Sequence, residues 1–158
     1  MHFPSRPLLL AAASAAMLTA PAVAHAGSPI RVEGGWVAAS LAGQRTGAAY
    51  LTLTNTGRAP DRLLGGTSPA AATVAPHHMA TDRGVMIMRK LDGVALPPGG
   101  RVVFKPGGDH LMLEGLKRPL KAGQTVALTL RFARTAALTV RLPVRPAMSG
   151  MAGMSIGR

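Results

Sequence analysis

The sequence predicts an all-β protein, a β-sandwich or barrel built from about nine short strands. Several short segments alternate between apolar and polar residues with a period of two, which is typical of strands that bury one face. Clusters of Gly, Pro and Asn separate these segments at regular intervals, as in sandwiches and barrels. Beyond residue 26, no segment has the 3.6-residue period of an amphipathic helix. The length of 158 residues favours one domain.

The strands expected in the first half of the chain follow one another at short intervals. The segment AAYLTLT (residues 48–54) alternates well and ends at the turn signal Asn55-Thr56-Gly57. The strands expected here are residues 30–32 leading to 36–38, then 48–54, 61–65, 72–77 and 85–89.

Turn residues set off the strands expected in the second half. PPGG (97–100) and KPGG (105–108) bracket a short strand at 102–104. The segment 116–124 contains Pro and Gly and is expected to be a loop, and the loop 133–136 predicts a hairpin. The remaining strands expected are 110–113, 125–132 and 137–142, and the core stripe predicted on the second of these is Val126, Leu128, Leu130 and Phe132.

The first 26 residues have the anatomy of a secretory signal peptide. Arg6 supplies a positive n-region, residues 8–24 form an apolar h-region, and small-residue cleavage sites follow, of which we favour the one after Ala26. The alternative is a membrane anchor, but the apolar stretch is shorter than the roughly 20 residues of a spanning helix and Pro21 interrupts it. We therefore expect an exported, periplasmic protein without stable membrane insertion.

The rest of the chain divides into a domain and a tail. Residues 27–146 carry the expected strands and form the predicted β-sandwich domain. Residues 147–158 consist mainly of Gly, Ala, Ser and Met without periodicity, and we expect a flexible Met-rich tail. Its methionines are Met148, Met151 and Met154.

Composition excludes several kinds of chemistry. The sequence contains no cysteine, so a cysteine nucleophile, a zinc–thiolate site and a blue-copper site are excluded. The formal net charge is +12, but the basic residues are scattered and only 3% of residues are aromatic, which argues against nucleic-acid binding. General surface basicity and an acidic partner both remain open. No Ser/His/Asp set or carboxylate pair indicates a hydrolase, and no catalytic residue is predicted.

Histidine and methionine gather in segments that are candidates for a soft-metal site. In HLML, alternation puts His110 and Met112 on the face opposite the leucines, and in VMIM it puts Met86 and Met88 on one face. A core strand has no reason to segregate methionine from Leu and Val. The alternative interpretation is a surface histidine and gap-filling methionines. The candidate segments are His77-His78-Met79, Met86 to Met88, His110 to Met112, and the tail.

These donors favour one metal above others. A thioether is a soft, neutral ligand that selects Cu(I) over zinc or hard cations, and imidazole suits copper in either oxidation state. A site of two His and two Met has no anionic ligand, so it does not favour the higher charge of Cu(II). Four protein ligands without an open position suit holding and handing over a metal rather than catalysis.

The spacing resembles that of a known family. His77, Met88, His110 and Met112 fit the pattern H-x10-M-x21-H-x-M of the PCu(A)C-type periplasmic copper chaperones. The flanking segments AAYLTLTNTG, DRGVMIM, LPPGG, HLML and GLKRPLKAG also resemble the family's sequence in the family's order. The resemblance covers roughly residues 30–144.

The resemblance implies a fold, a ligand set and partners. The fold would be a cupredoxin-like, Greek-key β-sandwich, and the four motif residues would bind Cu(I). The family is thought to deliver copper towards cytochrome c oxidase assembly, so the implied partners are the oxidase's copper-bearing subunit and a Sco-type thiol protein. Some members bind a second copper through a His- and Met-rich tail. Because this tail has no histidine, Cu(II) binding is not expected there, while Cu(I) binding and a plain flexible tail stay open.

Two positions depart from the family pattern, and several questions stay open. Asp109 stands where Tyr is common, and alternation points it away from the site; Ala75-Pro76 stands where an acidic–aliphatic pair is usual. Whether Met86 contributes to the site is undecided. Handover also predicts that His110 and Met112 lie near the surface, where an incoming ligand can reach them.

The same sequence features also fit other functions. A copper buffer or resistance protein would sequester the metal with the same ligands. Cleavage after Ala24 would leave His25 at the N-terminus, a chelate used by copper monooxygenases, although we expect no enzyme. An immunoglobulin-like interaction domain without metal is a further alternative.

Overall fold

The computed structural model describes residues 28–147, and its regular elements within that range are ten strands without an α-helix. The predicted all-β class is confirmed, with one strand more than the nine or so expected. The strands are β1 Ile30–Ala38, β2 Thr46–Asn55, β3 Asp61–Thr67, β4 Thr73–Asp82, β5 Val85–Lys90, β6 Val94–Leu96, β7 Arg101–Phe104, β8 His110–Glu114, β9 Thr125–Phe132 and β10 Leu138–Arg145.

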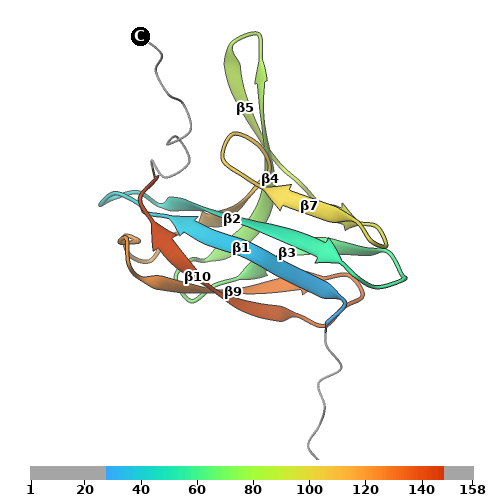
Figure 1. Ribbon diagram of the computed structural model, residues 1–158. Coiled ribbons are helices and arrows are strands. Elements are labelled where there is room, and N and C mark those ends of the chain that lie inside the picture. Colours follow the sequence, from blue (N-terminus) through green and yellow to red (C-terminus); the bar gives the residue numbers. More distant parts are fainter. Residues whose placement is uncertain (1–27, 148–158) are drawn as a thin grey trace, which may run out of the picture.

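The strands form two layers that are joined at both edges (Figure 1). One layer runs β4-β8-β2-β1, with β7 also paired to β2, and the other runs β10-β9-β3-β6. Parallel pairing of β1 with β10 joins the layers on one side. The single pair Gly66↔Val74 joins β3 to β4 on the other. A Cβ on Gly66 would lie 2.5 Å from the Thr129 carbonyl oxygen, so only glycine permits this approach of β3 to β9.

The core lies between the layers and consists mainly of leucine. From one layer, Leu53 and Leu111 are fully buried, and Leu63 and Leu128 face them from the other. At about 25 cal/mol per Å² of buried apolar area, such side chains each contribute roughly 1.5–3 kcal/mol. The predicted stripe on β9 is confirmed as part of this core: Val126, Leu128, Leu130 and Phe132 are all buried.

The sequence did not predict the length of β4. The expected strand ended at His77, but β4 continues to Asp82 and pairs with β5 as a hairpin. The two-residue loop Arg83-Gly84 has φ values of 47° and 81°, the signs that a type I′ turn requires. The short strand β6, which pairs with β3, was also not expected.

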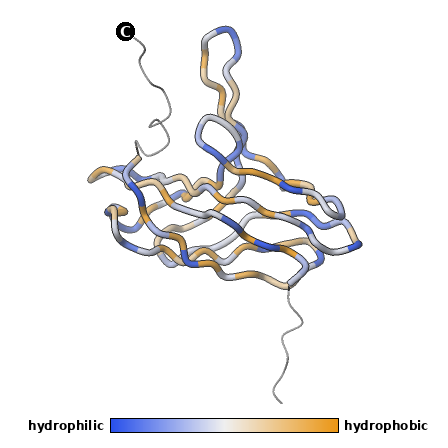
Figure 2. Tube along the Cα trace, viewed as in Figure 1, coloured by the Kyte–Doolittle hydropathy of each residue, from blue (hydrophilic) through white to orange (hydrophobic). Residues whose placement is uncertain are grey.

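The β4–β5 hairpin projects beyond the two layers as an arm (Figure 1). The arm carries hydrophobic as well as hydrophilic residues (Figure 2), and Val85 and Met86 are 64% and 71% exposed. The aliphatic face predicted for β5 therefore exists by alternation but does not reach the core. No residue of β5 belongs to the core cluster.

Two predicted segments lie outside the described residues. They are the signal peptide, residues 1–26, and the methionines of the tail, Met148, Met151 and Met154. Between residues 28 and 147, the chain has no helix with the length and apolarity needed to cross a membrane.

Candidate metal centre

Three neighbouring strands bring the predicted ligands to one face of the sheet. β4 pairs with β8 so that His77 lies directly opposite His110. β4 pairs with β5 so that Met79 lies directly opposite Met88. Directly opposite residues of antiparallel strands share a face, and so do residues two apart on one strand. His77, Met79, Met88, His110 and Met112 therefore all lie on the face that points away from the leucine core.

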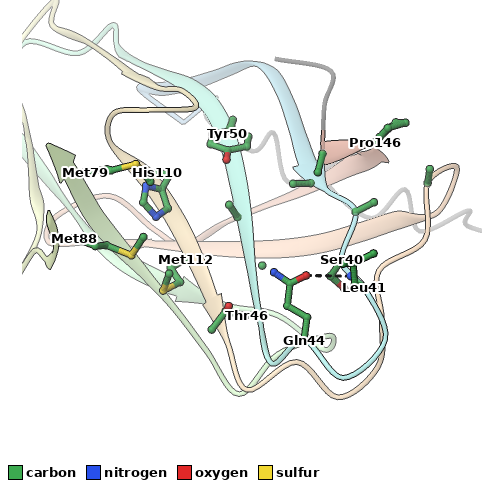
Figure 3. Close-up of a pocket in the computed structure, with 16 residues that line it drawn as sticks. Ser40, Leu41, Gln44, Thr46, Tyr50, Met79, Met88, His110, Met112 and Pro146 are labelled. Carbon is green, nitrogen blue, oxygen red and sulfur yellow. Dashed lines mark hydrogen bonds between the residues drawn. The ribbon is translucent and has the colours of Figure 1, made fainter. Parts of the chain in front are cut away.

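A pocket of about 630 Å³ opens on this face. One wall carries Met79, Met88, His110 and Met112, and the sulfur of Met79 lies beside the ring of His110 (Figure 3). The opposite wall is largely apolar and comes from distant segments: its lining includes Ala38, Ala39, Leu41, Ala48, Tyr50, Ala122 and Pro146. Of the four predicted ligands, Met88, His110 and Met112 line the pocket.

Backbone carbonyls fix the orientation of both imidazoles. Nδ1 of His77 lies 3.2 Å from the carbonyl oxygen of Ala75, and Nδ1 of His110 lies 3.1 Å from that of Gly108. A carbonyl only accepts, so in each contact Nδ1 donates its hydrogen. In the neutral ring, Nε2 is then left with a free lone pair, which is the form that binds a metal.

His77 lies beside the pocket without lining it. Its side chain is buried, and its Nε2 is 3.9 Å from a carboxylate oxygen of Glu114. Its ring centre is 6.0 Å from that of His110, with 23° between the two planes. An imidazole bound at about 2 Å places its ring centre about 3 Å from the metal. Two imidazoles on one tetrahedral ion have their ring centres roughly 5 Å apart, so binding one ion requires His77 to turn from Glu114 to the pocket and to move closer to His110.

Exposure within the ligand set differs from the prediction. His110 was expected near the surface, but it is only 2% exposed. The reason is that β8 is an inner strand between β2 and β4, and the far pocket wall covers its outer face. Met112 is half-buried, while Met88 is 46% exposed. The side chain that a partner meets first is thus Met88 on the projecting arm.

The sequence left open whether Met86 contributes to the site, and in the structure Met86 does not line the pocket. Met86 shares a face with Met88, but it lies nearer the hairpin turn, opposite Thr81. Met79 lines the pocket in its place. Alternation along β4 is enough to predict that Met79 lies on the face of His77. Its position opposite Met88 depends on the register of β4 on β5, which the Arg83-Gly84 turn sets.

Asp109 and His78 form a pair away from the pocket. Nδ1 of His78 and a carboxylate oxygen of Asp109 are in hydrogen-bond contact. His78 has the opposite parity to His77 on β4, so it points to the other side of the sheet. The prediction that Asp109 points away from the site agrees with this contact.

The pocket contains few charged groups. Among the described residues, no three His, Asp, Glu or Cys side chains are grouped closely enough to hold a metal. Tyr50 in the pocket wall packs against Trp36 with ring centroids 4.6 Å apart. Burial raises the pKa of Tyr50, which keeps the phenol neutral. Neutral thioethers and imidazoles therefore dominate the site.

Comparisons with known proteins agree with this architecture. In sequence, "Putative lipoprotein Lxx21020" of Leifsonia xyli subsp. xyli (strain CTCB07) is 38% identical over 117 residues, covering 73% of this chain and 69% of that protein. "Uncharacterized protein RP573" of Rickettsia prowazekii (strain Madrid E) is 36% identical over 86 residues, covering 54% of this chain and 48% of that protein.

Solved structures match over most of the described chain. The "Copper-bound PCuAC domain from PmoF2" has a TM-score of 0.64 and 28% identity, covering 75% of this chain and 93% of that chain. The "Solution structure of CuI-DR1885 from Deinococcus Radiodurans" has a TM-score of 0.58 and 38% identity, covering 74% and 78%. The predicted resemblance to PCuAC domains and the predicted cupredoxin-like sandwich are confirmed.

The family model matches almost the whole of the described sandwich. Residues 30–144 match the model of the LpqE-like family, "Putative lipoprotein LpqE-like". The match begins at the first residue of β1 and ends one residue before the end of β10. The chain therefore belongs to the LpqE-like family and has the fold of the copper-binding PCuAC domains.

Proposed function

We propose that this protein is a periplasmic Cu(I) metallochaperone. It binds one Cu(I) through Nε2 of His77 and His110 and the thioethers of Met88 and Met112. It then delivers the metal towards cytochrome c oxidase assembly. Its partners are the oxidase's copper-bearing subunit or a Sco-type thiol protein, and a cleavable signal peptide, residues 1–26, directs its export.

The observation that carries this proposal is the chemistry of one face of the β5-β4-β8 sheet. Two carbonyl-anchored imidazoles lie opposite each other, and methionines flank them beside a mostly apolar pocket. Neutral soft donors favour Cu(I) over divalent metals. A copper-bound PCuAC structure with the same fold supports the choice of metal.

The exposure of the ligands suits transfer to a partner. Met88 is 46% exposed, whereas His77 and His110 are buried. An incoming thiolate or imidazole reaches the thioether side first and displaces a weak neutral ligand. The histidines hold the ion until the new bonds form, so the copper never becomes free. Sequestration needs no such graded exposure, and this favours a chaperone over a buffer.

The ligand assignment is tested by anaerobic Cu(I) titration of the periplasmic protein against a chromophoric chelator. We expect the wild type to bind one equivalent of Cu(I) tightly. We expect the same of Met86→Leu, a conservative control on the β4–β5 hairpin. Met112→Leu keeps the volume but removes the sulfur, so we expect at least a tenfold loss, about 1.4 kcal/mol. Equal affinity in Met112→Leu and wild type would rule out Met112 as a ligand.

Delivery is tested in the source organism by deleting the gene. Delivery predicts low oxidase activity when copper is scarce and recovery when copper is added. A sequestering protein predicts normal oxidase activity and greater sensitivity to excess copper. Complementation with Met112→Leu ties either phenotype to the site.

A further inference from the structure

We propose that Met79 is an additional Cu(I) ligand that exchanges with Met88 during transfer. This inference rests on the proposed function and adds to it a fifth soft donor. The spacing pattern of the four predicted ligands does not include Met79.

The placement of Met79 is the first argument. It lies two residues after His77 on β4 and directly opposite Met88 on β5. It lines the pocket together with Met88, His110 and Met112, and its sulfur lies on the side of His110 (Figure 3). A Cu(I) ion bound to His110 is therefore flanked by thioethers from β4, β5 and β8.

Core packing does not explain this methionine. Met79 is half-buried, lies on the arm and is not part of the hydrophobic core cluster. Its neighbours on β4, His78 and Ala80, are exposed on the opposite face. Methionine often fills gaps in a core, but here the side chain faces an open pocket.

The chemistry of exchange is simple. Cu(I) takes up to four ligands, so with two imidazoles and three thioethers one sulfur is in excess. When a partner pulls Met88 away, the Cu–S bond to Met88 breaks and a Cu–S bond to Met79 forms. Copper stays Cu(I), and because a thioether carries no proton, none is released. The cross-strand position of Met79 keeps the entering and leaving sulfurs adjacent.

A double-mutant cycle with anaerobic Cu(I) titration tests the exchange. The variants are Met79→Leu, Met88→Leu, the double variant, and Met86→Leu as the matched control. If each sulfur substitutes for the other, each single variant loses less than about tenfold in affinity. The double variant then loses more than the product of the two single losses, on the order of a hundredfold or more, while Met86→Leu is unchanged.

Methionine-methyl ¹³C NMR gives a second readout that does not depend on affinity. On addition of Cu(I) to Met88→Leu, the Met79 methyl resonance should shift and that of Met86 should not. An unshifted Met79 methyl, with Met79→Leu harmless in both backgrounds, would overturn the inference while one bound copper upholds the proposed function. Absence of Cu(I) binding in both wild type and Met86→Leu would instead overturn the proposed function.

Discussion

The same local contact orients both candidate histidine ligands. In each case Nδ1 donates to the carbonyl two residues earlier on the same chain, Ala75 for His77 and Gly108 for His110. No side chain from another strand takes part in these two contacts. The tautomer that leaves the Nε2 lone pair free is therefore set by the local chain at both histidines, although only His110 lines the pocket and Nε2 of His77 lies 3.9 Å from Glu114.

Asp61 is a second single residue with a large structural effect. It is 9% exposed, and its carboxylate accepts hydrogen bonds from the backbone N–H groups of Arg62, Arg134 and Thr135. Burial raises the pKa of Asp61, but the hydrogen bonds from Thr135, Arg62 and Arg134 outweigh burial and lower it. The carboxylate thereby ties β3 to the loop between β9 and β10.

Replacement of Asp61 should destabilise the protein in a pH-dependent way. A pKa that is lower in the folded than in the unfolded state gives stability above the unfolded value, near 3.9, and loses it as pH falls through the folded value. Asp61→Asn should therefore cost about 1–3 kcal/mol at pH 7 and markedly less at pH 3. Urea denaturation at both pH values measures this. The exposed control Asp92→Asn should lie within about 0.5 kcal/mol of wild type at each pH, and a constant Asp61→Asn penalty would refute the ionic contribution.

At the scale of single strands, β8 shows most clearly what the sequence could predict. Alternation alone assigned Leu111 and Leu113 to the core and His110 and Met112 to the opposite face, and both leucines are fully buried. The period-two rule suffices because β8 is paired on both sides without a shift in register. The same rule predicted the stripe on β9.

The hairpin arm and the burial of His110 could not be predicted in this way. The loop Arg83-Gly84 needs positive φ at a non-glycine residue, and Arg gives a weaker turn signal than Asn or Asp. The membership of Met79 depends on the register that this turn sets. His110 is buried because Leu41, Tyr50 and Pro146 form the far wall of its pocket, and these residues are distant in sequence.

At the scale of the whole molecule, core and site occupy opposite faces of one layer. The sequence contains no cysteine, so no disulfide contributes and the fold depends on the leucine core and the strand pairing that closes both edges. The proposed ligands point outward from β4, β5 and β8. Stability and copper binding should consequently respond to different substitutions.

Linkage between copper binding and unfolding tests this separation. A ligand that binds only the folded state stabilises it by about 2.7 kcal/mol at 100 times its Kd, so Cu(I) should raise the free energy of unfolding of the wild type. Leu128→Ala should lower the metal-free value by about 2–5 kcal/mol and keep the full increment at the same saturation. Met112→Leu should stay within about 1.5 kcal/mol of wild type without metal and, with a tenfold or greater loss of affinity, lose at least about half of the increment.

The measurement is anaerobic urea denaturation with buffered Cu(I), at a free concentration fixed relative to the wild-type Kd. If Leu128→Ala also lost its copper increment while still folded, the core and the site would be energetically coupled. Strand alternation would then separate the two faces in geometry but not in energy. If the metal-free stability and the copper increment respond independently to substitution, β8 is rigid. Ligand exchange on its outer face then does not loosen the leucines on its inner face.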